Sequence, residues 1–131
     1  MAEESTPYVL KMRNTTTSAP PKPKHEWIVI VPDHEDVLDK RMAVRPSHLK
    51  NLTPKVEDGF WMMGGAILSE PISDPQKPQI TGSVMLAVAE SKEDVIRQLK
   101  DDIYFKSGVW DWDRVQVHPF KSAFRKNTEG V

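Results

Sequence analysis

The side chain best suited to proton transfer in this sequence is His48, which lies where an amphipathic helix is expected. It directly precedes Leu49, and Leu49, Leu52 and Val56 recur at the spacing of one helical face. An unperturbed imidazole titrates at about pH 6.5, so a histidine that reaches a cavity beside this face can act as a base at neutral pH. The alternative is that His48 has no chemical role and is a partly exposed polar residue at the edge of the apolar face.

A carboxylate that could assist such a histidine is Asp102. It follows Val95 by seven residues, which is about two helical turns, so it shares the apolar face with Val95 and Leu99 while Asp101 points elsewhere. An aspartate directed at a core needs a partner, because burying an unpaired charge is costly. If the helix ends by residue 100, both aspartates are expected to be solvated instead.

Arg45 and Ser83 are candidates for contact with a small ligand. The guanidinium of Arg45 could bind a carboxylate or phenolate through its fork of donors, or pair at the surface with Asp39 or Glu35. Ser83 could offer its hydroxyl to the ligand, or bond to backbone within a strand. It has no evident base and orienting group around it, so we do not expect a serine nucleophile.

Tryptophans and a glycine pair complete the candidate set. Trp61 and Trp110 could line a flat pocket for an aromatic or quinoid ligand, or seal a dimer interface. Gly64 and Gly65 mark a bulge or a close approach of the backbone, where an N–H could stabilise an anion. They lack the strand–GxGxxG–helix context of a nucleotide site.

The composition narrows the chemistry and the partners. The chain has no cysteine, and its four histidines show no metal-ligand spacing, so we expect neither a metal nor a redox cofactor. The net charge is −1 without a basic block, which argues against nucleic acid as a partner. No apolar run approaches the roughly 20 residues that cross a bilayer. With no secretory signal in evidence, we expect a cytoplasmic protein without a membrane partner.

The elements that must position these residues follow from the hydrophobic pattern. Apolar and β-branched runs bounded by turn residues predict strands, and the first and third of them are apolar on both alternating faces. The last run contains Pro119, which favours an edge strand. The predicted strands are 26–31, 60–68, 81–89 and 114–119.

Two helices are predicted between these strands. The first begins near Pro46, which suits the first helical position, after a charged loop over residues 33–40. Pro54 predicts a kink, or a second short helix that ends at Gly59. The other helix begins after Ser91, which opens a capping box, and presents Val95, Leu99 and Ile103 on one side.

The resulting order is βαββαβ, an α+β fold of the ferredoxin-like type. Two helices cover only one face of a four-stranded sheet, while two strands are apolar on both faces. We therefore expect a homodimer in which two sheets associate face to face. The expected organisation is a flexible N-terminal tail over 1–24, a domain over 25–124 and a C-terminal tail over 125–131.

Six short stretches occur in the order and spacing of a known family: Lys40-Arg-Met-Ala-Val-Arg-Pro-Ser-His-Leu49, Gly64-Gly65, Thr81-Gly-Ser83, Asp102-Ile-Tyr-Phe105, Gly108-Val109 and His118-Pro-Phe-Lys121. Through them the chain resembles the YCII-related family over about residues 25–124. The resemblance implies a dimeric α/β barrel of ferredoxin-like protomers. It also implies a pocket that holds a His-Asp dyad.

The resemblance assigns roles to two residues. His48 matches the histidine of the family's Arg-x-x-His-Leu motif, and Asp102 matches the aspartate of its Asp-Pro-Tyr/Phe motif, with Ile103 where proline is usual. Activities in the broader family include dehydrochlorination of a hydroxyquinol, and relatives occur among fungal natural-product enzymes.

These observations together predict a cofactor-independent lyase or isomerase. His48 and Asp102 would supply general acid–base chemistry, and Arg45 or a backbone N–H near Gly65 would stabilise the anion formed. The expected substrate is a small oxygenated aromatic, quinoid, lactone or anhydride compound, which undergoes elimination, decarboxylation or ring opening. The alternative is a non-catalytic dimeric domain that binds small molecules or acts as an accessory.

Overall fold

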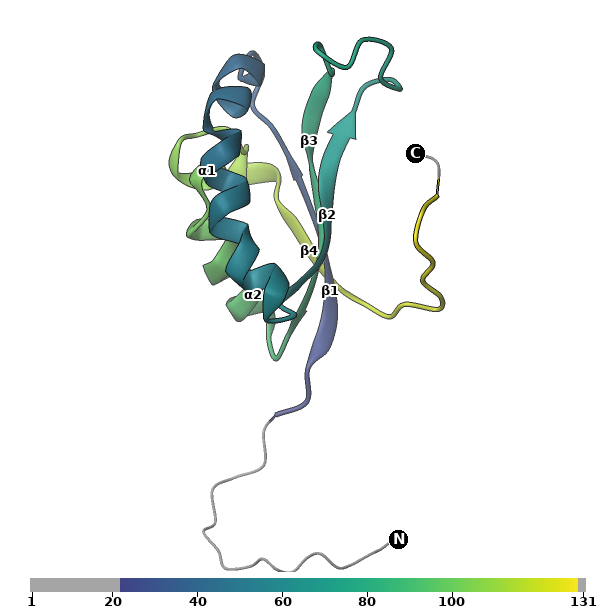
Figure 1. The fold of residues 1–131 in the computed structure, drawn as a ribbon. Coiled ribbons are helices and arrows are strands. Elements are labelled where there is room, and N and C mark those ends of the chain that lie inside the picture. Colours follow the sequence, from purple (N-terminus) through teal and green to yellow (C-terminus); the bar gives the residue numbers. More distant parts are fainter. Residues whose placement is uncertain (1–21, 130–131) are drawn as a thin grey trace, which may run out of the picture.

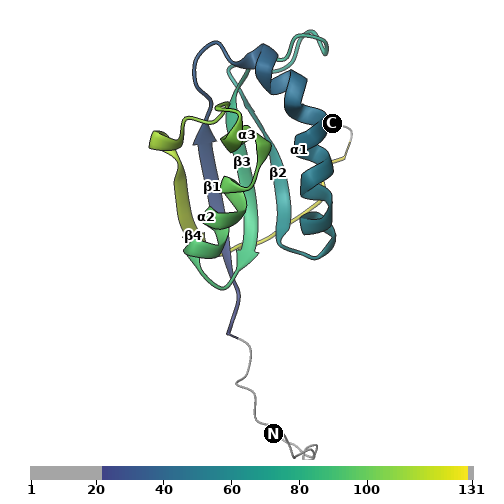
Figure 2. The same cartoon turned by 90° about the vertical axis from the view of Figure 1, so that its left-hand side faces the viewer.

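The structure is a computed structural model that describes residues 22–129 (Figure 1). The expected tail over residues 1–24 lies outside the described residues up to residue 21. In the described part, a single twisted sheet carries the helices on one face, and the chain after the last strand runs along the other side (Figures 1 and 2).

The sheet has four antiparallel strands in the spatial order β2-β3-β1-β4. This is the ferredoxin-like order, and it confirms the predicted fold class. The two strands that were expected to be apolar on both faces, β1 and β3, are the central ones. The strands are β1 (His25–Pro32), β2 (Trp61–Leu68), β3 (Ile80–Ala89) and β4 (Gln116–Phe120).

Two helical segments cover this sheet. Helix α1 (Leu38–Glu57) lies over the β2 side, and α2 (Lys92–Lys100) with the short α3 (Ile103–Lys106) lies over the β1 and β4 side (Figure 2). A 3-10 turn at Trp112–Arg114 leads into β4. No helix within residues 22–129 is long and apolar enough to cross a membrane.

Helix α1 corrects the prediction for the first helix, which placed its start near Pro46 after a loop. The helix begins eight residues earlier, at Leu38, and runs unbroken to Glu57, so both Pro46 and Pro54 lie inside it. Each proline removes one hydrogen bond to the carbonyl four residues earlier. Both prolines lie on the exposed side of the helix, where water can satisfy those carbonyls, so the helix tolerates them. Gly59, with a φ of 87°, ends the segment.

The helix after β3 begins as predicted and ends earlier. The Ser91 hydroxyl accepts a hydrogen bond from the Asp94 N–H at 3.2 Å and caps the first turn of α2. The helix then ends at Lys100 instead of continuing through Ile103. Asp102 therefore lies in the junction between α2 and α3, not on the apolar face of α2.

The core fills the space between the sheet and the helices. Val29 and Val31 of β1 point to this face, and the alternate residues Ile28 and Ile30 point to the other. Trp27 donates its indole N–H to the Ala89 carbonyl at 3.1 Å, beside the start of β1. The largest fully buried side chains are Trp110, Tyr104, Leu99, Val29, Val31, Val95 and Val109.

Candidate active site

His48 is buried on the face of α1 that packs toward the sheet. This face consists of Arg41, Val44, His48 and Leu52, which recur at intervals of three and four residues. Leu49 and Val56, which were expected to lead the core face, are 44% and 53% exposed. The helix is thus rotated relative to the prediction, and His48 lies at the centre of its buried face, not at the edge.

The imidazole of His48 contacts the carboxylate of Asp102. Nδ1 of His48 lies 2.8 Å from Oδ1 of Asp102, and both side chains are buried. A carboxylate oxygen accepts hydrogen bonds, so Nδ1 is the donor. Nε2 has no hydrogen-bond partner among residues 22–129, so it is the ring nitrogen that can take a proton. The structure therefore brings together the two residues expected to form a dyad.

Asp102 reaches this position because it caps a helix. Its Oδ1 also accepts the Tyr104 N–H at 2.8 Å, which satisfies the first turn of α3. The helical spacing predicts that Asp102 lies on the face of Val95 and Leu99, or in solvent if the helix ends by residue 100. The helix does end at residue 100, yet the aspartate is buried because it has two donors to accept.

Tyr104 packs between the dyad and a buried arginine. Its ring stacks on the His48 ring with centroids 3.9 Å apart and an interplanar angle of 16°. The guanidinium carbon of Arg41 lies 4.5 Å from the centroid of the same ring. Burial raises the pKa of the Tyr104 hydroxyl, and the positive charges of Arg41 and Arg45 act in the opposite direction.

Arg41 belongs to a buried polar network that anchors α1 to the sheet. Its Nη1 lies 2.8 Å and 2.9 Å from the two carboxylate oxygens of Asp33, and its Nη2 donates to the Ser83 hydroxyl at 2.9 Å. The indole N–H of Trp110 donates to the same hydroxyl oxygen at 3.1 Å. Burial raises the pKa of Asp33, while the charge and hydrogen bonds of Arg41 oppose that shift.

Among the described residues, the Ser83 hydroxyl bonds to side chains and not to backbone. Its oxygen accepts from Arg41 and Trp110, and its own hydrogen remains available to a ligand. Trp110 lies behind the dyad, with its ring edge-on to His48 at 6.4 Å, and supports the site without lining the cavity.

A cavity of about 640 Å³ opens in front of His48, between α1 and the strands β2 and β3. Its lining includes Arg45, Ser83, Gly65 and Trp61, all of which were expected to contact a ligand. The other lining residues are Arg41, His48, Leu49, Leu52, Thr53, Val56, Glu57, Met62, Met63, Gly64, Ala66, Ile80, Met85 and Tyr104.

Arg45 lies at the rim of this cavity with an exposed side chain. Within residues 22–129, no carboxylate lies within ion-pair distance of it, so neither Asp39 nor Glu35 neutralises its charge. The position leaves the guanidinium free to meet an anion at the mouth of the cavity.

Three residues of the site were missed from the sequence: Arg41, Asp33 and Tyr104. Arg41 precedes His48 by seven residues, a spacing that places both on one side of a helix, but the predicted helix began too late to include it. Tyr104 lies two residues after Asp102, in the stretch that carried the family resemblance. For Asp33, which followed a predicted strand, no local signal indicated a buried ion pair.

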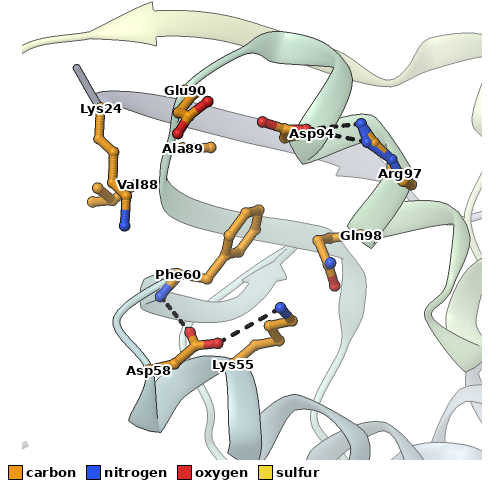
Figure 3. A pocket seen from close by; sticks show the side chains of 10 residues that line it. All are labelled: Lys24, Lys55, Asp58, Phe60, Val88, Ala89, Glu90, Asp94, Arg97 and Gln98. Carbon is orange, nitrogen blue, oxygen red and sulfur yellow. Dashed lines mark hydrogen bonds and ion pairs between the residues drawn. The ribbon is translucent and has the colours of Figure 1, made fainter. Parts of the chain in front are cut away.

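A second hollow of about 500 Å³ lies between the C-terminal end of α1 and α2 (Figure 3). Four of its six charged side chains are paired, because Lys55 contacts Asp58 at 3.6 Å and Arg97 contacts Asp94 at 2.7 Å. It has no buried reactive group, so the His48 cavity is the candidate site. Among the described residues, no group of three histidine or carboxylate side chains could hold a metal ion.

Residues 26–121 match the YCII-related domain family. The chain belongs to this family. Among YCII-related relatives, fusaric acid biosynthesis protein 2 of Gibberella moniliformis is 36% identical over 97 residues, which cover 74% of this chain and 93% of that protein. Protein YciI of Escherichia coli is 33% identical over 98 residues, covering 75% and 98%. Further relatives are named for fungal biosynthesis clusters.

A solved structure with a similar fold is the 5-chloro-2-hydroxyhydroquinone dehydrochlorinase of Burkholderia phenoliruptrix, in complex with 2,5-dihydroxybenzoquinone. Its TM-score is 0.64 with 24% sequence identity, over 73% of this chain and 93% of that chain. At this identity the likeness concerns the fold.

Proposed function

We propose that this YCII-related protein is an enzyme of small-molecule metabolism that works by proton transfer, as a cofactor-independent lyase or isomerase. The observation that carries the proposal is the contact between His48 and Asp102 at the wall of a cavity. A buried imidazole held by a carboxylate, with its second nitrogen free, is the arrangement that a general base requires. The substrate is a small oxygenated aromatic, quinoid, lactone or anhydride compound.

In the proposed reaction, Nε2 of His48 takes a proton from a carbon or hydroxyl of the substrate. The negative charge of Asp102 stabilises the imidazolium that forms and keeps the ring in one tautomer. The electrons left on the substrate move toward an oxygen, where Arg45, the Ser83 hydroxyl or a backbone N–H near Gly65 can stabilise them. The intermediate then expels a leaving group, opens a ring or regains the proton at another atom.

The relatives support this proposal in coarse terms. Fusaric acid biosynthesis protein 2 and the cluster proteins are named for pathways that build small organic molecules. The dehydrochlorinase with a similar fold removes a chloride from a hydroxylated ring, which is an elimination of the proposed class. A role in tailoring a small molecule is consistent with each of these.

The test compares wild type with His48→Ala, Asp102→Asn and the control His118→Ala on a panel of hydroxyquinols, hydroxyquinones, lactones and cyclic anhydrides in deuterated water. Proton NMR reports both conversion and exchange at carbon. We expect His48→Ala to lower the rate about 100- to 10,000-fold, because that is what a general base contributes. Asp102→Asn should lower the rate less, since its amide oxygen still caps α3 but carries no charge.

The control residue His118 is exposed on β4, where its Nε2 contacts Gln116 at 3.0 Å. The His118→Ala substitution should leave the rate unchanged. If His48→Ala turns over the same compound at the wild-type rate, the dyad is not catalytic. Compounds that bind to the wild type without conversion or exchange would favour the accessory ligand-binding function instead.

A further inference from the structure

We propose that the His48 cavity takes an amphiphilic ligand, with one anionic, oxygen-bearing head beside Arg45 and an uncharged apolar substituent of several carbons that extends along α1 toward Val56. This inference deepens the proposed function, because it names the substrate class of the same site.

The head is placed by the distribution of charge along α1. Arg41, Arg45 and His48 all line the N-terminal half of the cavity. The charge of Arg41 is already offset by Asp33, which it contacts through both carboxylate oxygens. Arg45 has no carboxylate partner within residues 22–129, so of the two arginines its guanidinium is the one that a ligand anion can pair with. A ligand with a single negative charge matches it.

The apolar part is placed by the C-terminal half of the same helix. Leu49, Leu52 and Val56 line the cavity on one helical stripe, and Trp61 and Met62 of β2 also line it. Leu49, Val56 and Met62 are 44%, 53% and 49% exposed, and no described residue covers them. Apolar surface of this extent at a cavity favours an apolar occupant over water.

The dimensions leave room for more than one small ring. Arg45 and Val56 are eleven residues apart, which is about 16 Å along a helix. An apolar cavity of about 150 Å³ is enough for benzene, and this cavity measures about 640 Å³. A single oxygenated ring at His48 therefore leaves the Val56 end unfilled.

The far end also limits the charge of the substituent. Glu57 is the one carboxylate among the lining residues, and it lies beyond Val56, twelve residues from Arg45. A second anionic group at that end would be repelled, so the substituent is neutral. Thr53 adds no free donor, because its hydroxyl is bonded to the Leu49 carbonyl at 2.9 Å.

The test measures how affinity depends on chain length. Binding of benzoate and of 4-n-alkylbenzoates from methyl to hexyl is measured by calorimetry on the full chain. Each methylene buried along Leu52 and Val56 should lower Kd about fourfold, from the transfer free energy of one CH₂ group. Arg45→Gln should weaken every member of the series by the same factor, about tenfold, and leave the increment per methylene unchanged.

Two substitutions, at positions of similar solvent exposure, test where the apolar substituent lies. Val56→Asp should remove the increment per methylene and leave the affinity for benzoate itself. Ile72→Asp, in the loop outside the cavity and 54% exposed, should change neither. Both positions are exposed, so both variants are expected to fold, which the melting temperature checks.

His48→Ala separates this inference from the proposed function. The increment per methylene should survive in that variant whether or not turnover does. An affinity that does not depend on chain length, or the same increment in Val56→Asp, would overturn the inference. The inference would also be overturned if Val56→Asp changed the oligomeric state without changing the affinity increment per methylene. That result would mean that a second copy of the chain covers the stripe of Leu49, Leu52 and Val56.

Discussion

At the scale of single residues, His48 and Ser83 are each held by partners that leave one useful atom free. Asp102 holds Nδ1 of His48 and leaves Nε2. Two donors hold the oxygen of Ser83 and leave its hydrogen. The geometry of the cavity wall is thus fixed before a ligand arrives, which is the condition for efficient proton transfer.

Arg41 is the residue whose loss should cost the most stability. Arg41→Met would leave the Asp33 carboxylate buried without its partner, and removing one member of a buried pair destabilises by about 3 kcal/mol or more. We expect urea denaturation to show that the free energy of unfolding falls by about this amount. The matched control is Arg97→Met, which removes an arginine from an exposed pair with Asp94. Exposed pairs contribute about 1 kcal/mol at most, so equal losses in the two variants would contradict this account.

The sequence identified the two dyad residues and not the reason for their contact. The residue pattern left both side chains with a solvent-exposed alternative, and the resemblance to the YCII-related family favoured the dyad. The actual cause, a cap on α3, depends on where α2 ends, and local pattern fixes helix ends poorly. The pair of Arg41 and Asp33 depends on tertiary contact alone, so periodicity could not have revealed it.

At the scale of elements, α1 is a long helix of 20 residues that contains two prolines in its interior. Replacing Pro54 by alanine would restore an N–H that can bond to the Lys50 carbonyl. An interior proline costs about 3 kcal/mol relative to alanine, and the gain in unfolded-state entropy returns up to about 1 kcal/mol of that.

We therefore expect Pro54→Ala to raise the free energy of unfolding by about 1 to 2 kcal/mol, measured by chemical denaturation. Pro75→Ala, in the loop between β2 and β3, should lower it slightly, because only the entropy effect applies there. A drop for Pro54→Ala would mean that the proline shapes the helix in a way that its contacts do not explain.

The segment after β4 is tied to β1 through Glu26. Its carboxylate accepts from the Ser122 N–H at 3.0 Å, and it also contacts the Ser122 hydroxyl and Arg125. The hydrogen bonds from Ser122, followed by the contact with Arg125, lower the pKa of Glu26 from 4.5 to about 2. The ionised form is the one that the folded state favours.

This shift sets the sign of a pH dependence. A carboxyl with a lowered folded pKa contributes stability that is fully present above its unfolded value of 4.5 and is lost as the pH falls toward 2. We expect the melting temperature of wild type to exceed that of Glu26→Gln above pH 4.5, and the difference to shrink as the pH falls through 2. Thermal unfolding scans of both proteins across this pH range measure the difference in melting temperature. A difference that grows on acidification would have the wrong sign.

At the scale of the whole molecule, one face of the sheet has no helix over it (Figures 1 and 2). Ile28 and Ile30 of β1 point to this face beside Leu86 and Val84 of β3, with which they are in register. The apolar residues on both faces of the central strands were visible in the sequence and predicted this arrangement. That a second copy of the chain covers this face stays a prediction, because the pattern requires a cover without specifying which surface provides it.

We expect the chain to form a homodimer through this face. Light scattering at micromolar concentration should give about twice the chain mass of 14.9 kDa. Ile30→Lys should shift the particle toward the monomer, since it places a charge in the centre of the contact, whereas Ile72→Lys in the exposed loop should not. A stable wild-type monomer would contradict the proposed homodimer.

The oxygen of Asp102 that accepts from both His48 and the Tyr104 N–H has an evolutionary consequence. Under the proposed function, a descendant that abandoned catalysis could lose the histidine and still need the aspartate to start α3. Retention of the aspartate is then under two selective pressures, and retention of the histidine under one. Among homologues, the aspartate alone therefore says little about activity. A lineage that keeps it while replacing the histidine marks the point where the chemistry was given up.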